Sequence, residues 1–227
     1  NPFRGMELPR LYASKSEFNR FVGIESEVIT HYDDANHYSE EADVPTNFEV
    51  VNDGSLNGGG VEFRTNRPII GKTVLSALDN LERVHRDYDN YIDSSCGLHI
   101  HMNARDLAFV EIKSLLMIMT KIQPLLYLSL PSDREDNYCR QLEWSMEELR
   151  GIRNLPQLVT SYYNLQDSVF SDEKYNEARY IGTNIHARFL LGSIEFRYHE
   201  GTTNSTEIVA WIRFLNKIMK QSINLHS

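Results

Sequence analysis

Apolar and polar residues alternate in six segments of the chain, and each alternation predicts a β-strand. Successive side chains of a strand point to opposite faces, so the polar residues of a segment share one face and the apolar residues share the other. Turn residues between the second and third segments and between the fifth and sixth predict two hairpins. The predicted strands cover residues 20–29, 48–51, 61–65, 96–103, 180–189 and 193–199.

Elsewhere apolar residues recur at intervals of three and four, which predicts amphipathic helices. Two long helices are predicted at residues 73–92 and 107–128, and Pro124 is expected to bend the second one. A final helix is predicted after Asn204, because Asn204 and Glu207 have the spacing of a capping box.

The polar faces of four predicted strands carry side chains that can bind divalent metal ions. In the first strand Glu25 and Glu27 share a face, where their like charges repel unless water or a cation lies between them. In the fourth strand His99 and His101 share a face, and neutral imidazole nitrogens are common metal ligands. The candidate metal ligands on these four strands are Glu25, Glu27, Glu62, His99 and Glu195.

Each of these patterns also has a simpler interpretation. Two like side chains on one strand face are most often solvated or hydrogen-bonded, without a metal. Arginine follows glutamate at the next same-face position in Glu62–Arg64 and Glu195–Arg197, which is the spacing of a structural ion pair. The metal interpretation gains support if antiparallel strands bring the four polar faces together on one sheet surface.

The residue types indicate the kind of metal and the kind of ligand. Carboxylate-rich sites favour hard cations such as Mg²⁺ or Mn²⁺, whereas zinc sites recruit more histidine or cysteine. Carboxylates that share a surface with arginine are typical of sites where metal ions hold a polyphosphate and guanidinium groups stabilise the transferred phosphoryl group. The residue types alone are equally compatible with a metal-dependent hydrolase.

Composition narrows the class of protein. The 227 residues carry a net charge of −9, which argues against a general nucleic-acid footprint. No apolar run has the length that a membrane span needs, so we expect no membrane partner. Cys96 and Cys139 lack the paired spacing of a zinc site, and we interpret them as free thiols of a cytoplasmic protein. The first residue is Asn1 rather than Met, which suggests a fragment or a processed chain.

Six short motifs, taken in order, resemble those of the amidoligase family, a branch of the glutamine synthetase and glutamate–cysteine ligase superfamily of carboxylate–amine ligases. The resemblance extends from about residue 20 to about residue 204. The motifs are Gly23-Ile24-Glu25-Ser26-Glu27; Asp53-Gly54-Ser55 with Glu62; Gly97-Leu98-His99-Ile100-His101; Arg134 with Asn137-Tyr138-Cys139; Arg179-Tyr180 with Asn184; and Ile194-Glu195-Phe196-Arg197 with Glu200-Gly201-Thr202.

The resemblance implies three groups of functional residues. The residues expected to hold the Mg²⁺ or Mn²⁺ ions that bridge ATP are Glu25, Glu27, Glu62, His99 and Glu195. Those expected to contact phosphate or a substrate carboxylate are Arg197, Arg179 and Arg134. Those expected to contact the nucleotide or support the site are Ser55, His101 and Asn184.

The resemblance also implies an α+β fold like the glutamine synthetase catalytic domain. We therefore expect a single domain over residues 1–227, in which a curved, mainly antiparallel sheet carries the site on its concave face and helices cover its convex face. The implied activity is ATP-dependent amide formation through an acyl phosphate. The carboxylate and amine substrates could be peptides, small metabolites, cell-wall fragments or modified bases. A metal-dependent phosphoesterase or nuclease and a non-catalytic binding module are the alternatives.

Overall fold

In the computed structural model, the described residues are 18–31, 35, 38, 44–58, 60–128 and 138–225. They divide into two units. The strand-rich unit holds the described residues of Tyr12–Met102 and His199–Asn216, and the helix-rich unit holds those of Asn103–Tyr198 and Lys217–Ser227. Each unit is described by itself, and the single-domain expectation stays a prediction. Among the described helices, none combines the length and the apolar character that crossing a membrane requires.

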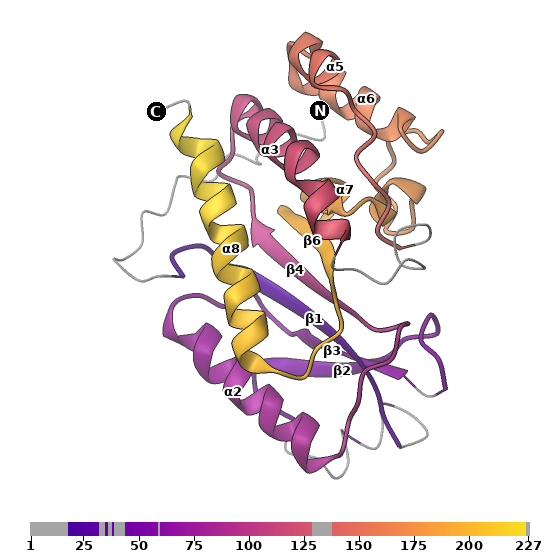
Figure 1. The fold of residues 1–227 in the computed structure, drawn as a ribbon, viewed down its shortest axis with the longest axis vertical. Coiled ribbons are helices and arrows are strands. Elements are labelled where there is room, and N and C mark those ends of the chain that lie inside the picture. The colour runs from indigo at the N-terminus through magenta and orange to yellow at the C-terminus, as the bar shows by residue number, and fades with distance from the viewer. Residues whose placement is uncertain are drawn as a thin grey trace. The chain divides into compact units, whose positions relative to one another are not determined.

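The strand-rich unit contains four antiparallel strands, which Figure 1 shows side by side. Their order is β2, β3, β1, β4, since β3 pairs with β2 and β1, and β1 pairs with β4. These elements confirm the first four predicted strands. Their bounds are β1 (Val22–Ile29), β2 (Phe48–Asn52), β3 (Gly60–Thr65) and β4 (Gly97–Asn103).

Helix α2 (Lys72–Asp87) covers the apolar face of these strands. The ring of His85 on α2 meets the ring of Phe63 on β3 edge to face, with centroids 4.9 Å apart. The apolar side of α2 and the apolar strand residues are almost fully buried, so roughly 2 kcal/mol of transfer free energy per large side chain favours this packing. The buried apolar residues that form this core are Ile24, Val28, Val61, Phe63, Val74, Leu78, Leu81, Leu98 and Ile100.

The end of α2 differs from the prediction, which continued the helix to residue 92. The helix ends at Asp87, and Asp89 adopts a left-handed backbone with φ of 49°. The chain then turns back, so that Tyr91 exchanges two backbone hydrogen bonds with Ile29 of β1, at 2.8 and 3.0 Å. Tyr91 continues the helical spacing of apolar residues, but aspartate tolerates the left-handed conformation that stops a helix.

The helix-rich unit contains mainly helices and the strand pair β5–β6. Strand β5 pairs antiparallel with β6, with Asn184 opposite Glu195. Proline 124 lies inside α3, and the bend expected there stays a prediction. The elements are α3 (Phe109–Tyr127), α5 (Met146–Gly151), α6 (Leu155–Asn164), η1 (Glu177–Tyr180), β5 (Thr183–Asn184), α7 (His186–Leu190) and β6 (Ser193–Glu200).

The strand predicted at residues 180–189 is wrong. Only Thr183 and Asn184 form a strand there, and α7 follows at once. The alternation misled because the polar residues at His186 and Arg188 are buried rather than solvated. His186 hydrogen-bonds the Tyr163 hydroxyl and the Glu173 carbonyl, and Arg188 donates to the carbonyls of Ala104 and Leu107.

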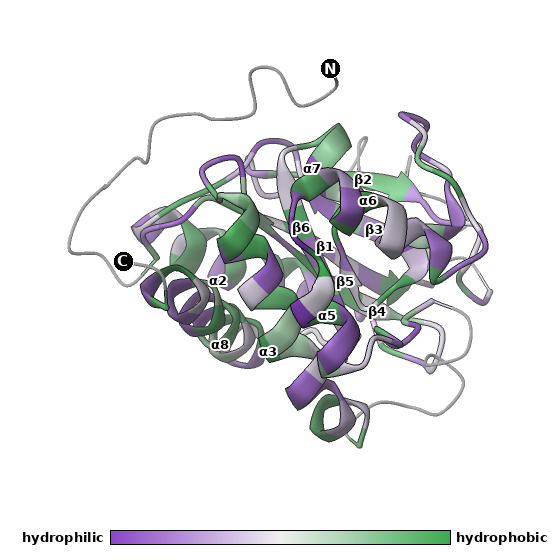
Figure 2. Cartoon of the chain, turned by 90° about the horizontal axis from the view of Figure 1, so that it is seen from above, coloured by the Kyte–Doolittle hydropathy of each residue, from purple (hydrophilic) through white to green (hydrophobic). Residues whose placement is uncertain are grey.

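The last helix, α8 (Ser205–Asn224), begins where the sequence predicts. The Asn204 side chain accepts hydrogen bonds from the backbone N–H groups of Thr206 and Glu207, at 2.9 and 3.3 Å, which is N-cap geometry. The Glu207 carboxylate accepts from the Thr202 hydroxyl instead of closing the predicted capping box. Figure 2 shows both hydrophilic and hydrophobic residues along α8, as expected of an amphipathic helix.

We predict that His85 makes the protein sensitive to mild acid. Burial lowers the pKa of His85 to about 3, while an unfolded histidine protonates near pH 6.5. Below pH 6.5 the unfolded chain therefore binds a proton that the folded chain does not, and folding loses free energy as the pH falls. Relative to wild type, His85→Gln should gain about 2 kcal/mol of unfolding free energy between pH 7 and pH 5.

Urea unfolding at the two pH values measures this difference. The matched control is His31→Gln, which removes an exposed imidazole from the same unit. Equal pH dependence in wild type and His85→Gln would show that His85 does not stay neutral in the folded protein.

Candidate functional site

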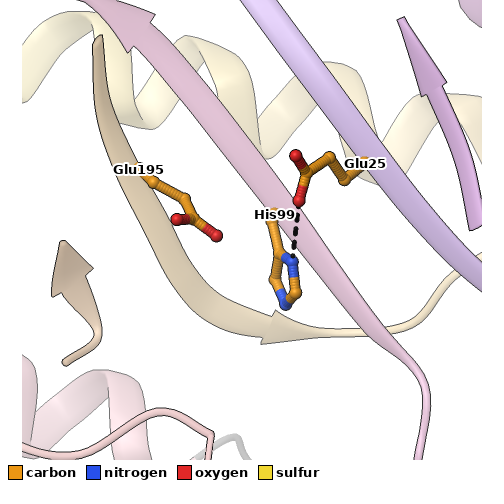
Figure 3. A group of neighbouring side chains, drawn as sticks. All are labelled: Glu25, His99 and Glu195. Atoms are coloured by element: carbon orange, nitrogen blue, oxygen red, sulfur yellow. Dashed lines mark hydrogen bonds and ion pairs between the residues drawn. The ribbon is translucent and has the colours of Figure 1, made fainter. Parts of the chain in front are cut away.

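Glu25 lies between two imidazoles on the polar face of the strand-rich unit. Glu25 of β1 is paired in the strand register with His99 of β4. The two side chains point toward each other in Figure 3, and His99 Nδ1 lies 3.3 Å from Glu25 Oε2. The other oxygen, Oε1, lies 3.2 Å from His101 Nε2. One carboxylate therefore contacts both histidines of the His-x-His pair, as the shared strand face predicts.

The charge state of Glu25 follows from these neighbours. Burial by itself would raise its pKa, because a buried carboxylate loses hydration. The positive charge and hydrogen bonds that His101 and His99 offer outweigh burial and hold the pKa of Glu25 well below its usual range. Glu25 is thus an anion at neutral pH, as a metal ligand must be.

A second group contains three carboxylates, Glu27, Asp53 and Glu62. Glu27 on β1 and Glu62 on β3 are directly opposite in the strand register, and one oxygen from each of the three residues lies within 4.8 Å of the others. Burial and the charges of Glu25, Glu27 and Asp53 raise the pKa of Glu62 to about 8. Like charges opposite each other destabilise a sheet, and either a proton on Glu62 or a bound cation relieves this repulsion.

The backbone holds Glu27 in place. Its Oε2 accepts a hydrogen bond of 2.6 Å from the N–H of Gly97, at the start of β4, and its Oε1 lies 3.7 Å from His99 Nε2. Glu27 is only 5% exposed. A buried carboxylate that is fixed by a backbone donor keeps its remaining oxygen in one position, which favours a specific site over a solvated face.

Asp53 is a candidate ligand that the sequence analysis missed. It lies in the turn after β2, where its Oδ1 accepts hydrogen bonds from the Ser55 backbone N–H at 2.8 Å and the Ser55 hydroxyl at 2.6 Å. Aspartate followed by glycine is common in turns, and this ordinary role hid the residue. The signal in the sequence was the Asp53-Gly54-Ser55 motif, of which only Ser55 was assigned a role. Ser55 itself is exposed.

In the helix-rich unit, Glu195 and Arg197 lie on β6, and both are buried. They form an ion pair with each other, so the structural interpretation of their spacing holds for this pair. Arg197 Nε also donates to the Tyr138 carbonyl at 2.8 Å, and Asn184 Nδ2 donates to Glu195 Oε2 at 2.6 Å. Asn184 thus fixes the predicted ligand Glu195, which is also drawn in Figure 3.

Of the other two arginines predicted to contact a ligand, the structure describes Arg179 but not Arg134. Arg179 lies on η1, and its guanidinium lies over the rings of Tyr175 and Tyr180, at 5.1 and 5.4 Å from the ring centroids. Arg134 lies outside the described residues, so its role stays a prediction.

The donor set fits a divalent cation. Glu27, Asp53 and Glu62 offer three carboxylates, and Glu25 and His99 offer a carboxylate and an imidazole on the same face. Hard cations such as Mg²⁺ and Mn²⁺ prefer these oxygen-rich sets. The raised pKa of Glu62 indicates that the three carboxylates do not easily carry their full charge without such an ion.

Comparison with known families gives an independent result. A family model described as "Putative amidoligase enzyme" matches residues 16–219. The chain belongs to this amidoligase family. The match includes both units and confirms the resemblance of the ordered motifs. A comparison with curated proteins gave no match. Membership of the amidoligase family indicates a ligase-type enzyme.

We predict that the cluster of Glu27, Asp53 and Glu62 destabilises the protein when no metal is bound, and that a bound metal ion removes this destabilisation. With its pKa raised to about 8, Glu62 takes up a proton on folding at pH 7, which costs free energy. Glutamine avoids this cost, so in EDTA at pH 7 the free energy of unfolding of Glu62→Gln should rise by about 1 kcal/mol or more. Mn²⁺ should raise the melting temperature of wild type and have little effect on Glu62→Gln.

Thermal melts with and without Mn²⁺ measure both effects. Glu49→Gln is the matched control, because Glu49 is 48% exposed on the neighbouring strand and pairs with Arg64. That variant should keep the full response to Mn²⁺. If Mn²⁺ stabilised Glu62→Gln as much as wild type, Glu62 would not be a ligand.

Proposed function

We propose that this amidoligase-family chain is an ATP-dependent carboxylate–amine ligase that forms an amide through an acyl phosphate. The observation that supports it most directly is the set of Glu25, Glu27, Glu62 and His99 on one strand face, with Asp53 in the adjoining turn. The chain that carries this set also has the ordered amidoligase motifs. The fold implied is that of the glutamine synthetase catalytic domain.

The proposed reaction has two steps. An oxygen of the substrate carboxylate attacks the γ-phosphorus of ATP, the bond to the β-phosphate oxygen breaks, and ADP leaves. The amine nitrogen then attacks the acyl carbon, inorganic phosphate leaves, and the nitrogen loses a proton. The division is needed because a free carboxylate is a poor acyl donor, whereas an acyl phosphate has a good leaving group.

The residues have distinct roles in this proposal. Glu27, Asp53 and Glu62 hold one divalent cation, and Glu25 and His99 offer further ligands on the same strand face. Glu195 keeps the metal-ligand role that the family resemblance implies. When bound, such cations offset the charge of the phosphate oxygens. The remaining roles follow from hydrogen bonds: Gly97 orients Glu27, and Asn184 orients Glu195.

Arg197 is assigned to the charge that develops on the transferred phosphoryl group. Arg197 is 5% exposed, and its guanidinium is held by Glu195 and the Tyr138 carbonyl, so it is oriented before a ligand arrives. A preorganised donor of this kind stabilises a transition state without the cost of rearrangement. His101, Ser55 and Arg134 keep the supporting and nucleotide-binding roles that the family resemblance implies.

The first prediction of the proposal concerns ATP binding. Calorimetry should show that Mg²⁺ or Mn²⁺ strengthens ATP binding, and that Glu27→Gln reduces this metal dependence about tenfold or more, because the variant loses a charged ligand fixed by Gly97. Glu49→Gln again serves as the control. ATP binding that is independent of metal in wild type would contradict the proposed role of the carboxylates.

The second prediction concerns turnover. Arg197→Lys keeps the charge but loses the planar two-point grip, so it should preserve metal-dependent ATP binding while ADP release falls by roughly a hundredfold or more. Arg150→Lys, at an exposed position of α5, is the matched control. An unchanged rate in Arg197→Lys would leave Arg197 with a structural role only.

The turnover measurement needs accepted substrates, which a screen of carboxylates and amines can find by ADP release with Mg²⁺ present. ADP formation that requires both a carboxylate and an amine supports the ligase. Metal-dependent cleavage of a phosphodiester without ADP formation would instead indicate the phosphoesterase or nuclease alternative.

A further inference from the structure

Two Asp-x-Ser turns of the strand-rich unit have the same internal hydrogen bonds. In the first turn, Asp53 Oδ1 accepts from the backbone N–H of Ser55 at 2.8 Å and from its hydroxyl at 2.6 Å. In the second turn, Asp93 Oδ1 accepts from the backbone N–H of Ser95 at 2.8 Å and from its hydroxyl at 2.5 Å. Aspartate side chains commonly close turns in this way. The two turns are also joined to each other, and the connection runs through Asp93.

Asn57, which follows the first turn, is bound by the second turn at two points. Its side-chain Nδ2 donates to Asp93 Oδ2 at 3.1 Å, and its backbone N–H donates to the Ser95 hydroxyl oxygen at 3.2 Å. The Ser95 hydroxyl can serve both neighbours, because it donates to Asp93 and accepts from Asn57. We call these two hydrogen bonds of Asn57, to Asp93 and to Ser95, the tether.

The second turn is a firm support, because it leads directly into buried backbone. The Cys96 N–H donates to the Asp93 carbonyl at 3.1 Å, and Cys96 is buried. The Cys96 carbonyl in turn accepts a hydrogen bond of 2.9 Å from the Gly201 N–H. The next residue, Gly97, donates the N–H that holds Glu27 Oε2. Asp93 is therefore anchored in the same segment that fixes the candidate ligand Glu27.

The first turn depends more on such a support. Most residues at 54–58 are exposed. On the side of β3 the turn is held by the Asp53 N–H, which donates to the Gly60 carbonyl at 3.5 Å, and by the Leu56 side chain, which lies against Gly60. On the side of β4 the tether holds it. Exposed turns open locally at little cost in free energy, so each such contact changes how long the turn keeps one position.

The carboxylate cluster of Glu27, Asp53 and Glu62 contains one candidate ligand that lies in a turn rather than on a strand, Asp53. We propose that Asp93 and Asn57 are positioning residues that hold Asp53 in this cluster and thereby set the affinity of the cluster for a divalent cation. The inference rests on the proposed function, because it requires that the cluster binds a metal ion. Groups that orient metal ligands typically change metal affinity about 10- to 100-fold. Because the tether acts through Asp53, its loss cannot cost more affinity than the loss of the Asp53 carboxylate.

Calorimetry with Mn²⁺ alone, without nucleotide, measures this affinity. In Asp93→Asn the amide oxygen keeps the two bonds from Ser95, so the amide nitrogen meets Asn57 Nδ2, donor against donor. Mn²⁺ binding should therefore weaken about three- to tenfold. Asn57→Ala removes the same hydrogen bond from the exposed side and should weaken binding by a similar factor. Asp53→Asn, which removes the ligand charge itself, should weaken binding about tenfold or more.

Two double variants distinguish positioning from direct contact with the ion. Asp53→Asn combined with Asp93→Asn should bind Mn²⁺ as Asp53→Asn does, because the tether then has no carboxylate to position. Asn57→Asp combined with Asp93→Asn exchanges donor and acceptor at the same net charge, so binding should return to within about twofold of wild type. Additive losses in the first double variant, or no recovery in the second, would overturn the positioning role.

Hydrogen exchange in EDTA reports on the tether without metal. The Asn57 N–H should exchange roughly two- to fivefold faster in Asp93→Asn than in wild type. Asp79→Asn is the matched control, because it removes one negative charge from an exposed position of α2 in the same unit. It should match wild type in both exchange and Mn²⁺ affinity. Equal losses of Mn²⁺ affinity in Asp93→Asn and Asp79→Asn would show an effect of net charge and overturn the proposal.

The outcome for the tether is distinguishable from the outcome for the proposed function. If wild type binds Mn²⁺ and both Asp93→Asn and Asn57→Ala bind it equally well, the positioning role is wrong and the metal site stands. If wild type binds no Mn²⁺, the metal site is wrong and the positioning role fails with it. Should Asp93→Asn fail to fold, as judged by circular dichroism, Asn57→Ala at its exposed position decides the matter.

Discussion

Repulsion between carboxylates on one face of the strand-rich unit is the constraint to which the other features of that unit respond. Glu27 and Glu62 are directly opposite in the register, and Asp53 lies within reach of both. A protein selected only for stability would not place three acids there, because each pair costs free energy. The surrounding groups reduce the cost: a backbone N–H donates to Glu27, and two imidazoles contact Glu25.

Burial of apolar side chains on the opposite face of the same strands offsets the free-energy cost of the repulsion between the carboxylates. Ile24, Phe63, Leu98 and Ile100 are fully buried, and α2 packs against that face through His85. The division of labour between the faces follows from the two-residue period of a strand. Local instability at a functional site is tolerated because packing elsewhere compensates for it.

The sequence predicts this unit well because its alternation is strict. The strands that carry Glu25, Glu27, Glu62 and His99 lie where the pattern places them, and these side chains share a face. Asp53 was missed because a turn has no periodicity from which to infer a direction. The segment at 180–189 failed for another reason: buried His186 has hydrogen-bond partners from distant segments, which local alternation cannot reveal.

The antiparallel register has a consequence for how such a chain can vary. In the strand register, Glu25 of β1 lies opposite His99 of β4, and Glu27 of β1 lies opposite Glu62 of β3. Both pairings depend on the same alignment of β1 with its two neighbours. Inserting a single residue within β1 would turn Glu25 and Glu27 to the apolar side and send their buried neighbours into water. Changes in chain length are therefore expected in the connecting turns rather than in β1. A substitution inside β1 alters one candidate ligand, whereas an insertion or deletion there separates Glu25 and Glu27 from His99 and Glu62.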